Sequence, residues 1–196
     1  MSNSLSPSLL NLIESLRCLP GVGKKTAQRL AIYLMDKNRD GAKNLESAIS
    51  LALSITSNCS KCQVLADESL CPICQSSRRN NGQLCIVESP LDLLAIEESS
   101  AYQGRYFVLN GKISPLDGIG PNELKLDILI SQLDDIDEII LAISPTVEGE
   151  ATAHYINEML DDKNIKISKI AYGVPFGGEL EYLDQQTLTH AFSTRR

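Results

Sequence analysis

The chain has 196 residues, of which 18 are Lys or Arg and 25 are Asp or Glu, so its formal net charge is −7 at pH 7. With 43% hydrophobic and 22% charged residues, the composition fits one or two folded domains and excludes a wholly disordered chain, a collagen and a long coiled coil. No apolar run approaches the ~18 residues that suggest a membrane-spanning helix. Met1 to Leu10 has neither the basic start nor the apolar stretch of a secretory signal, so we expect a cytoplasmic protein.

The two parts of the chain differ in charge. Residues 1–80 contain 10 Lys/Arg and 6 Asp/Glu, a balance of +4, whereas residues 81–196 contain 8 and 19, a balance of −11. Such a change of sign favours two modules with different partners, although a drift of charge on solvated faces explains it equally well. The turn signal Asn80-Asn81-Gly82 is a suitable boundary between the modules.

Residues 8–58 show the apolar periodicity of helices. Apolar side chains recur at spacings of three and four within 9–16, 27–34 and 45–55, which predicts three amphipathic helices. Asn44 is placed to cap the third of them.

A glycine-containing segment, Leu-Pro-Gly-Val-Gly, separates the first two predicted helices. Gly21 and Gly23 permit a sharp turn and expose backbone N–H groups to an anion. Positive side chains follow at the start of the next helix, namely Lys24, Lys25 and Arg29. This pattern resembles a helix-hairpin-helix, which binds the DNA backbone without reading its sequence. A plain interhelical turn with solvated lysines is the alternative.

Four cysteines form two Cys-x2-Cys pairs separated by eight residues: Cys59, Cys62, Cys71 and Cys74. Four thiolates at this spacing can surround one Zn²⁺ in tetrahedral geometry, with Zn–S distances of ~2.3 Å. Because the cysteines fill all four positions, the zinc would be structural and would fold a segment too small for its own core. Disulfides are disfavoured without a secretory signal, and a redox pair is the other alternative. Cys18 and Cys85 lack partners at metal spacing and are expected to be buried thiols.

Beyond Gly82, short apolar runs alternate with helical segments, which implies a parallel sheet covered by helices. Strands are predicted at Leu84–Val87, Tyr106–Leu109, Glu138–Ile143 and Ile165–Ile170, and helices at Pro90–Glu98, Pro121–Leu133 and Glu148–Leu160. The residues from Ala171 onward are rich in Gly and Pro, with a weak helical pattern at Gln185–Phe192.

Polar residues follow two of the predicted strands, at the edge where parallel sheets place their sites. Glu88 follows the first strand, and the segment after the third contains Ser144, Thr146, Glu148 and Glu150. The layout resembles a Toprim domain, in which a glutamate and an Asp-x-Asp at these places hold Mg²⁺ for phosphoryl transfer. Ser144 and Thr146 take the two aspartate positions here, and neutral hydroxyls do not replace carboxylates for a hard dication. We therefore expect a Toprim scaffold without catalysis, in which the remaining glutamates support at most weak, transient Mg²⁺ binding.

The combined motifs resemble the RecR family of bacterial recombination mediators. They are Leu-Pro-Gly-Val-Gly at 19–23, the four cysteines, and the segments Ser114–Pro121, Pro145–Thr152 and Gly173–Tyr182. The resemblance runs from about Leu9 to Arg196. Lys24 and Ser144 depart from the proline and asparagine common in the family, and neither change removes an expected role.

The resemblance implies a DNA-repair protein that is not an enzyme. Members act with RecO and RecF to help load RecA at single-stranded gaps, and they form dimers and ring-like tetramers around DNA. The family's DNA-contacting basic positions correspond to Lys25 and Arg29, beside Lys24, Gly21 and Gly23. The acidic patch approached by RecO corresponds to Glu88, Glu148 and Glu150. Glu148 and Glu150 would equally suit a helix start, where the helix dipole favours acidic residues.

We therefore predict an α+β multidomain protein in four parts. These are a helix-hairpin-helix DNA-binding region at 1–58, a four-cysteine zinc finger at 59–80, an α/β Toprim domain at 81–171, and a Walker B-like oligomerisation segment at 172–196. The leading hypothesis is a homo-oligomeric mediator with one structural Zn²⁺ per chain, no resident Mg²⁺ and no membrane partner. The rival hypotheses are a Mg²⁺-dependent Toprim nuclease, primase or topoisomerase-like enzyme, and a zinc-folded adaptor that binds only protein.

Overall fold

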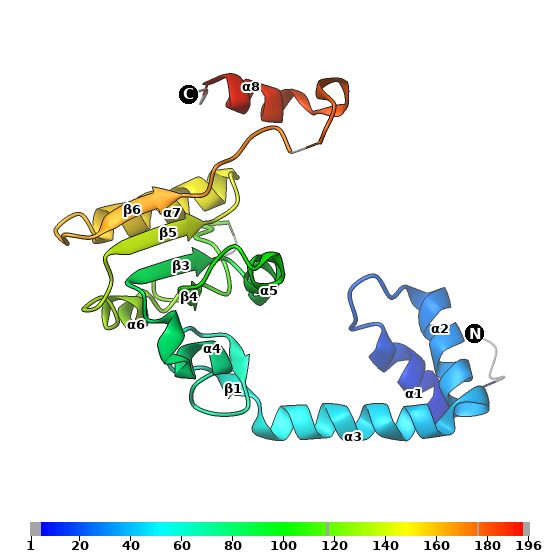
Figure 1. The fold of residues 1–196 in the computed structure, drawn as a ribbon. Helices are drawn as coiled ribbons and strands as arrows, with labels where there is room; N and C mark the ends of the chain where they lie inside the picture. Colours follow the sequence, from blue (N-terminus) through cyan, green and yellow to red (C-terminus); the bar gives the residue numbers. More distant parts are fainter. Residues whose placement is uncertain (1–4, 117, 176, 194–196) are drawn as a thin grey trace. The chain divides into compact units, whose positions relative to one another are not determined.

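A computed structural model describes residues 5–116, 118–175 and 177–193. The chain divides into two compact units, Met1–Thr56 and Ser57–Arg196 (Figure 1). Asp117 and Phe176, which belong to the motifs quoted above, lie outside the described residues, as do residues 194–196 of the C-terminal segment.

The described part of the first unit is helical. Its elements are α1 (Pro7–Leu16), α2 (Lys24–Ile32), a π-helical turn (Tyr33–Lys37) and α3 (Arg39–Ile55). Ile13 of α1 packs against Ala27 and Ala31 of α2, where small side chains let the two helices approach closely. Asn38 caps α3 by accepting a hydrogen bond from the Gly41 N–H, so the predicted cap at Asn44 is wrong because the helix begins before it.

The cysteine segment opens the second unit. The two-residue strands β1 (Ser57–Asn58) and β2 (Leu65–Ala66) pair antiparallel. The short helix α4 (Pro72–Gln75) and a 3-10 turn (Ser77–Arg79) follow. These elements surround the four cysteine side chains.

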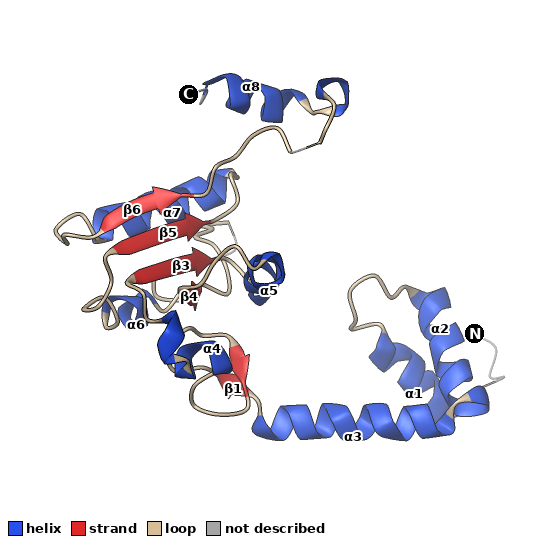
Figure 2. Ribbon diagram, in the orientation of Figure 1, coloured by secondary structure: helices blue, strands red, loops and turns tan. Residues whose placement is uncertain are grey.

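A four-stranded parallel sheet forms the centre of the second unit. Its strands are β3 (Gln83–Val87), β4 (Arg105–Val108), β5 (Glu138–Ala142) and β6 (Lys166–Lys169), in the order β4-β3-β5-β6 (Figure 2). Val87 lies opposite Val108 on one side and Ala142 on the other, so the carboxyl ends of three strands meet at one edge. The predicted parallel sheet is therefore confirmed.

Successive strand residues face opposite layers, as the period of two requires. Leu84 and Ile86 of β3 belong to the larger core with Ile156 of α7 (Val147–Met159). Cys85 and Val87 belong to a second cluster with Leu93 of α5 (Pro90–Ser99). Strands that are buried on both faces read as continuous apolar runs, which is why the sequence predicts them well.

The helix predicted at Pro121–Leu133 is largely wrong. Only α6 (Leu126–Ile130) is helical there, because Lys125 just before it has a left-handed backbone with φ of +51°. The weak C-terminal pattern forms a 3-10 turn (Leu180–Tyr182) and α8 (Gln185–Ser193). A parallel sheet with helices, preceded by a helical unit and the cysteine segment, confirms the α+β multidomain class.

Candidate DNA-contact, metal and acidic sites

The turn between α1 and α2 depends on one of its two glycines. Gly21 has φ of +77°, a region that favours glycine, and the Val22 N–H closes the turn by donating to the Leu19 carbonyl at 3.1 Å. Gly23 has an ordinary φ of −75° and precedes α2. No atom lies within 4 Å of where its Cβ would be, so its surroundings are open to a ligand.

The start of α2 carries uncompensated positive charge. No side chain caps this helix, and its first turn has no acidic residue, so the first N–H groups face solvent together with the positive end of the helix dipole. Lys24, Lys25 and Arg29 are all exposed. None of the three forms an ion pair within the part of the chain that the structure describes. This surface can accept a phosphate.

The four cysteines gather into one buried cluster. All four sulfur atoms lie within 4.8 Å of one another, and Cys62 Sγ is 3.5 Å from Cys71 Sγ. A tetrahedron of thiolates around Zn²⁺ has edges of about 3.8 Å at the usual Zn–S length, so the spacing fits. The Cys71 N–H points at Cys59 Sγ at 3.4 Å, and the Cys74 N–H points at Cys71 Sγ at 3.5 Å.

The protonation of the cluster also points to a cation. A hydrogen bond from the Cys62 thiol lowers the pKa of Cys74 to about 6, and the same bond raises the pKa of Cys62. Burial raises the pKa of Cys71. Thiolates gathered this closely repel one another, so a bound cation would stabilise them, and the donor set of four soft sulfurs suits Zn²⁺.

The other two cysteines differ from each other. Cys85 is buried in β3, as expected, and burial raises its pKa to about 12. Cys18 is exposed, so the expectation that it is a buried thiol is wrong. It lies in the turn after α1, which the small core of the first unit does not cover.

The cysteine segment is bonded to the sheet. The Val108 N–H of β4 donates to the Cys62 carbonyl at 2.8 Å, and Asn110 Nδ2 donates to the Gln63 carbonyl at 3.1 Å. Lys125 Nζ donates to Gln63 Oε1 at 3.0 Å. The segment therefore packs as one body with the sheet and does not form an independent finger.

Arg79 adds a charged link at the end of this segment. Its guanidinium donates two bonds to the Glu97 carboxylate of α5, at 2.8 and 2.5 Å, and the Tyr106 hydroxyl donates to Glu97 at 2.7 Å. The hydrogen bonds from Arg79 hold the pKa of the Glu97 carboxyl below its usual range. Arg79 contributes one positive charge to the +4 balance of residues 1–80, but this charge is paired with the Glu97 carboxylate.

The acidic edge of the sheet is organised around Glu88. Its Oε1 accepts bonds from the N–H and the hydroxyl of Ser144, at 2.7 and 2.5 Å. Lys112 Nζ lies 3.4 Å from Glu88 Oε2, 3.3 Å from Ser144 Oγ and 3.5 Å from Thr146 Oγ1. The positions matched to Toprim metal ligands are therefore bonded to one another and to a lysine.

The other two glutamates are not part of this contact. Glu150 lies in the first turn of α7, where it pairs with Lys169 of β6 at 2.7 Å, and Glu148 is exposed in the same turn. Among the described residues, the cysteines are the only group of three or more His, Cys, Asp or Glu with ligand atoms close enough to share a metal ion. The three glutamates do not form such a group.

Sequence reasoning did not identify Lys112 as a site residue. Asn110 and Gly111 precede it in a turn at the end of β4, and Asn110 has a left-handed φ of +55°. A basic residue directly after a strand of the same sheet was the available signal, because that place faces the carboxyl ends of the neighbouring strands.

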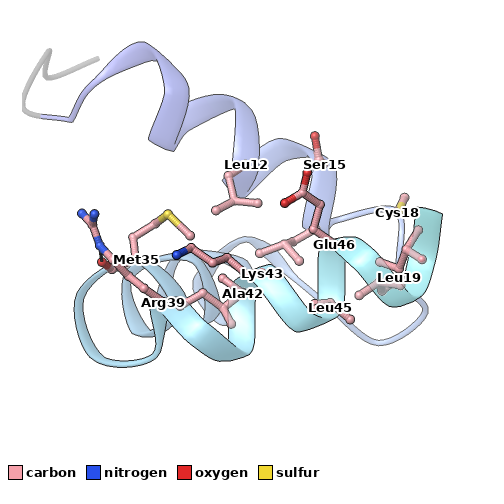
Figure 3. A pocket seen from close by; sticks show the side chains of 13 residues that line it. Leu12, Ser15, Cys18, Leu19, Met35, Arg39, Ala42, Lys43, Leu45 and Glu46 are labelled. Atoms are coloured by element: carbon pink, nitrogen blue, oxygen red, sulfur yellow. Dashed lines mark hydrogen bonds between the residues drawn. The ribbon is translucent and has the colours of Figure 1, made fainter. Parts of the chain in front are cut away.

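Helix α3 lines an apolar groove in the first unit. None of its 17 residues is buried, and Ile49 is 51% exposed. The groove has a volume of about 700 Å³ and lies between α3, α1 and the π-helical turn, with Leu12, Leu19, Met35 and Leu45 among the side chains that line it (Figure 3). An amphipathic helix with its apolar face uncovered indicates a missing partner.

No described helix has the length and apolarity to cross a bilayer.

Comparisons with known proteins agree with the features of the helical unit and of the sheet. Residues 9–53 match the family described as RecR, helix-hairpin-helix, residues 82–171 match the Toprim domain, and residues 173–196 match RecR, C-terminal.

Full-length relatives carry the name recombination protein RecR. That of Francisella tularensis subsp. holarctica (strain FTNF002-00 / FTA) is 58% identical over 196 residues, covering 99% of this chain and 98% of the relative. That of Francisella tularensis subsp. novicida (strain U112) is 57% identical with the same coverage. That of Francisella philomiragia subsp. philomiragia is 58% identical over 198 residues. The chain therefore belongs to the RecR family of recombination proteins.

Proposed function

We propose that the protein is a DNA-binding recombination mediator that grips the DNA backbone with the start of α2. The supporting observation is the uncapped, acid-free helix start beside three exposed cations, Lys24, Lys25 and Arg29. Gly21 and Gly23 would let the phosphates approach the backbone, since no side chain fills the space around them. Contacts of this kind give affinity that depends on salt and not on base sequence.

The variant Lys25→Ala/Arg29→Ala tests this proposal. We expect weaker binding to DNA and a log Kd against log salt slope reduced by about 1 to 2, because each phosphate contact contributes about 0.7 to 0.9 to the slope. Lys163→Ala removes an exposed charge in the other unit and serves as the control. Fluorescence anisotropy across a salt titration measures both quantities, and an unchanged slope in the double variant would refute the assignment.

We also propose that the Toprim domain acts without catalysis. As a mediator, the protein would act with RecO and RecF to help load RecA at single-stranded gaps. It would do so in the cytoplasm and without a membrane partner. Glu148 and Glu150, exposed in the first turn of α7, support the proposed acidic approach surface for RecO, whereas Glu88 is only 16% exposed and faces Lys112. A DNA product that requires Mg²⁺ and Glu88, from nicked, supercoiled or primed DNA, would favour the enzymatic rival instead.

One structural Zn²⁺ per chain completes the proposal. Cys59, Cys62, Cys71 and Cys74 would hold it, and the coordination would fix the segment between α3 and the sheet. Because sulfur fills all four positions, the metal would have no open site for a substrate. We propose that the helix-hairpin-helix region, the zinc-binding segment and the Toprim domain end at residues 58, 80 and 171, and that the C-terminal segment follows.

The uncovered face of α3 supports a homo-oligomer, either a dimer or a ring-like tetramer. We propose that the groove is covered by the same face of a second copy. The rim carries Arg39 and Lys43 beside Glu46, so two copies related by a two-fold axis can pair opposite charges around an apolar centre.

A further inference from the structure

A lysine lies where a metal-dependent Toprim domain holds its divalent cation. The Lys112 ammonium is within 3.5 Å of one oxygen each of Glu88, Ser144 and Thr146. These three residues take the positions that correspond to the Mg²⁺ ligands of a metal-dependent Toprim domain. We propose that the ammonium of Lys112 is the permanent cation of this site and excludes divalent ions from it.

The oxygens around Lys112 are already committed. Glu88 Oε1 accepts both the N–H and the hydroxyl of Ser144, which leaves Oε2 for the ammonium. The Glu88 side chain is 16% exposed and that of Lys112 is 31% exposed, so solvent screens the pair only in part. A carboxylate that is largely withdrawn from solvent is stabilised by such a partner, and the lysine supplies it without a metal.

Mg²⁺ does not fit this arrangement. It requires six oxygens at about 2.0–2.1 Å, with carboxylates among them. An ammonium ion needs no such shell, and that of Lys112 contacts its oxygens at 3.3 to 3.5 Å. An incoming dication would meet a like charge a few ångströms away, and this repulsion disfavours its entry even at the effective dielectric of a protein surface.

Both sides of Lys112 are anchored, so the side chain emerges from a fixed place. The Gly111 N–H donates to the Glu88 carbonyl at 3.1 Å. The Ile113 N–H donates to Thr152 Oγ1 of α7 at 2.9 Å. These bonds fix the backbone of Lys112 beside the carboxyl ends of β3 and β5, and the contacts with Glu88, Ser144 and Thr146 then place its ammonium.

The test restores the missing carboxylates with and without the lysine. In zinc-loaded full-length protein, Ser144→Asp/Thr146→Asp is compared with the same pair plus Lys112→Met, using Mn²⁺ as the probe in calorimetry and electron paramagnetic resonance. We expect Mn²⁺ to bind the triple variant at least about tenfold more tightly, because the like charge is gone. Lys163→Met in the same background removes a lysine elsewhere and should leave affinity unchanged.

Equal Mn²⁺ affinity with and without Lys112 would overturn the proposal. A second measurement avoids the case in which the triple variant does not fold. Wild-type protein and Glu88→Gln are titrated with Mn²⁺ under the same conditions, and we expect no difference between them. Binding to the wild type that Glu88→Gln abolishes would show that a divalent ion enters despite Lys112. Neither experiment involves DNA, so its outcome is independent of the proposed grip by α2.

Discussion

The bond between Arg79 and Glu97 shows how one side-chain pair joins two parts of the second unit. The two side chains are only 18% and 24% exposed, and both guanidinium bonds reach the same carboxylate. Arg79 also lies 3.4 Å from the Tyr102 and Gly104 carbonyls before β4. The pair therefore fixes the end of the cysteine segment against α5 and the sheet.

Replacing Glu97 with Gln should make stability less dependent on pH. Because Arg79 lowers the pKa of Glu97 in the folded state, the pair stabilises the protein above the ordinary glutamate pKa of about 4.3. That contribution is lost as the pH falls through the folded-state pKa. We expect Glu97→Gln to cost about 1.5–3 kcal/mol at pH 7, the range for hydrogen bonds to charged groups.

Urea unfolding at pH 7 and at several lower values measures this effect. The difference between wild type and Glu97→Gln should shrink as the pH falls below about 4, because Glu97 then becomes neutral in the wild type as well. Since the cysteine site also titrates, only the difference between the two proteins is informative. A constant difference over the whole range would show that the charge of Glu97 contributes nothing.

At the scale of elements, the cysteine segment should protect one edge of the sheet. We expect Cys71→Ser to abolish binding of the proposed Zn²⁺ and to raise hydrogen exchange by roughly tenfold or more in residues 57–79 and at the Val108 amide, which donates to the Cys62 carbonyl. Amides of α7 belong to the other core cluster and should stay protected. Mass spectrometry of exchanged peptides and metal analysis give both readouts.

Cys18→Ser is the matched control, because this thiol is exposed and outside the cluster. It should retain the zinc and the wild-type exchange pattern. If Cys71→Ser kept full zinc content, the cysteine cluster would not be the metal site. If it lost zinc without faster exchange at Val108, the segment would not stabilise the sheet.

Elements with strong local signals could be predicted, and contacts between distant residues could not. The buried strands and α7 followed from continuous apolar runs and helical spacing, and the cysteines from their own spacing. The helix predicted at Pro121–Leu133 failed because the left-handed backbone at Lys125 prevents the helix from starting before Leu126. Lys112 reaches Glu88 and Ser144 only after three strands have aligned, so its place after β4 indicates the edge of the sheet but not these partners.

At the scale of the whole molecule, the structure shows which charged side chains of residues 1–80 and 81–196 are paired and which are exposed. Arg79 is neutralised internally, whereas the lysines at the start of α2 remain exposed. Several acids of the second part are also paired, including Glu88 with Lys112 and Glu150 with Lys169. The number of charged residues in each part therefore overstates how many charges a partner meets, and the exposed, unpaired groups decide where DNA or a basic protein can bind.

The uncovered face of α3 leads to the last prediction, which concerns assembly. We expect Ile49→Glu to weaken self-association by at least about tenfold, since a charge would replace an apolar side chain at the centre of a desolvated interface. Ser47→Glu adds the same charge two residues away on the helix, outside the groove, and should assemble like the wild type. Light scattering after size exclusion distinguishes a 21.4 kDa monomer from larger species over a range of concentrations. A monomeric wild type, or an Ile49→Glu variant of unchanged mass, would mean that this groove does not hold copies together.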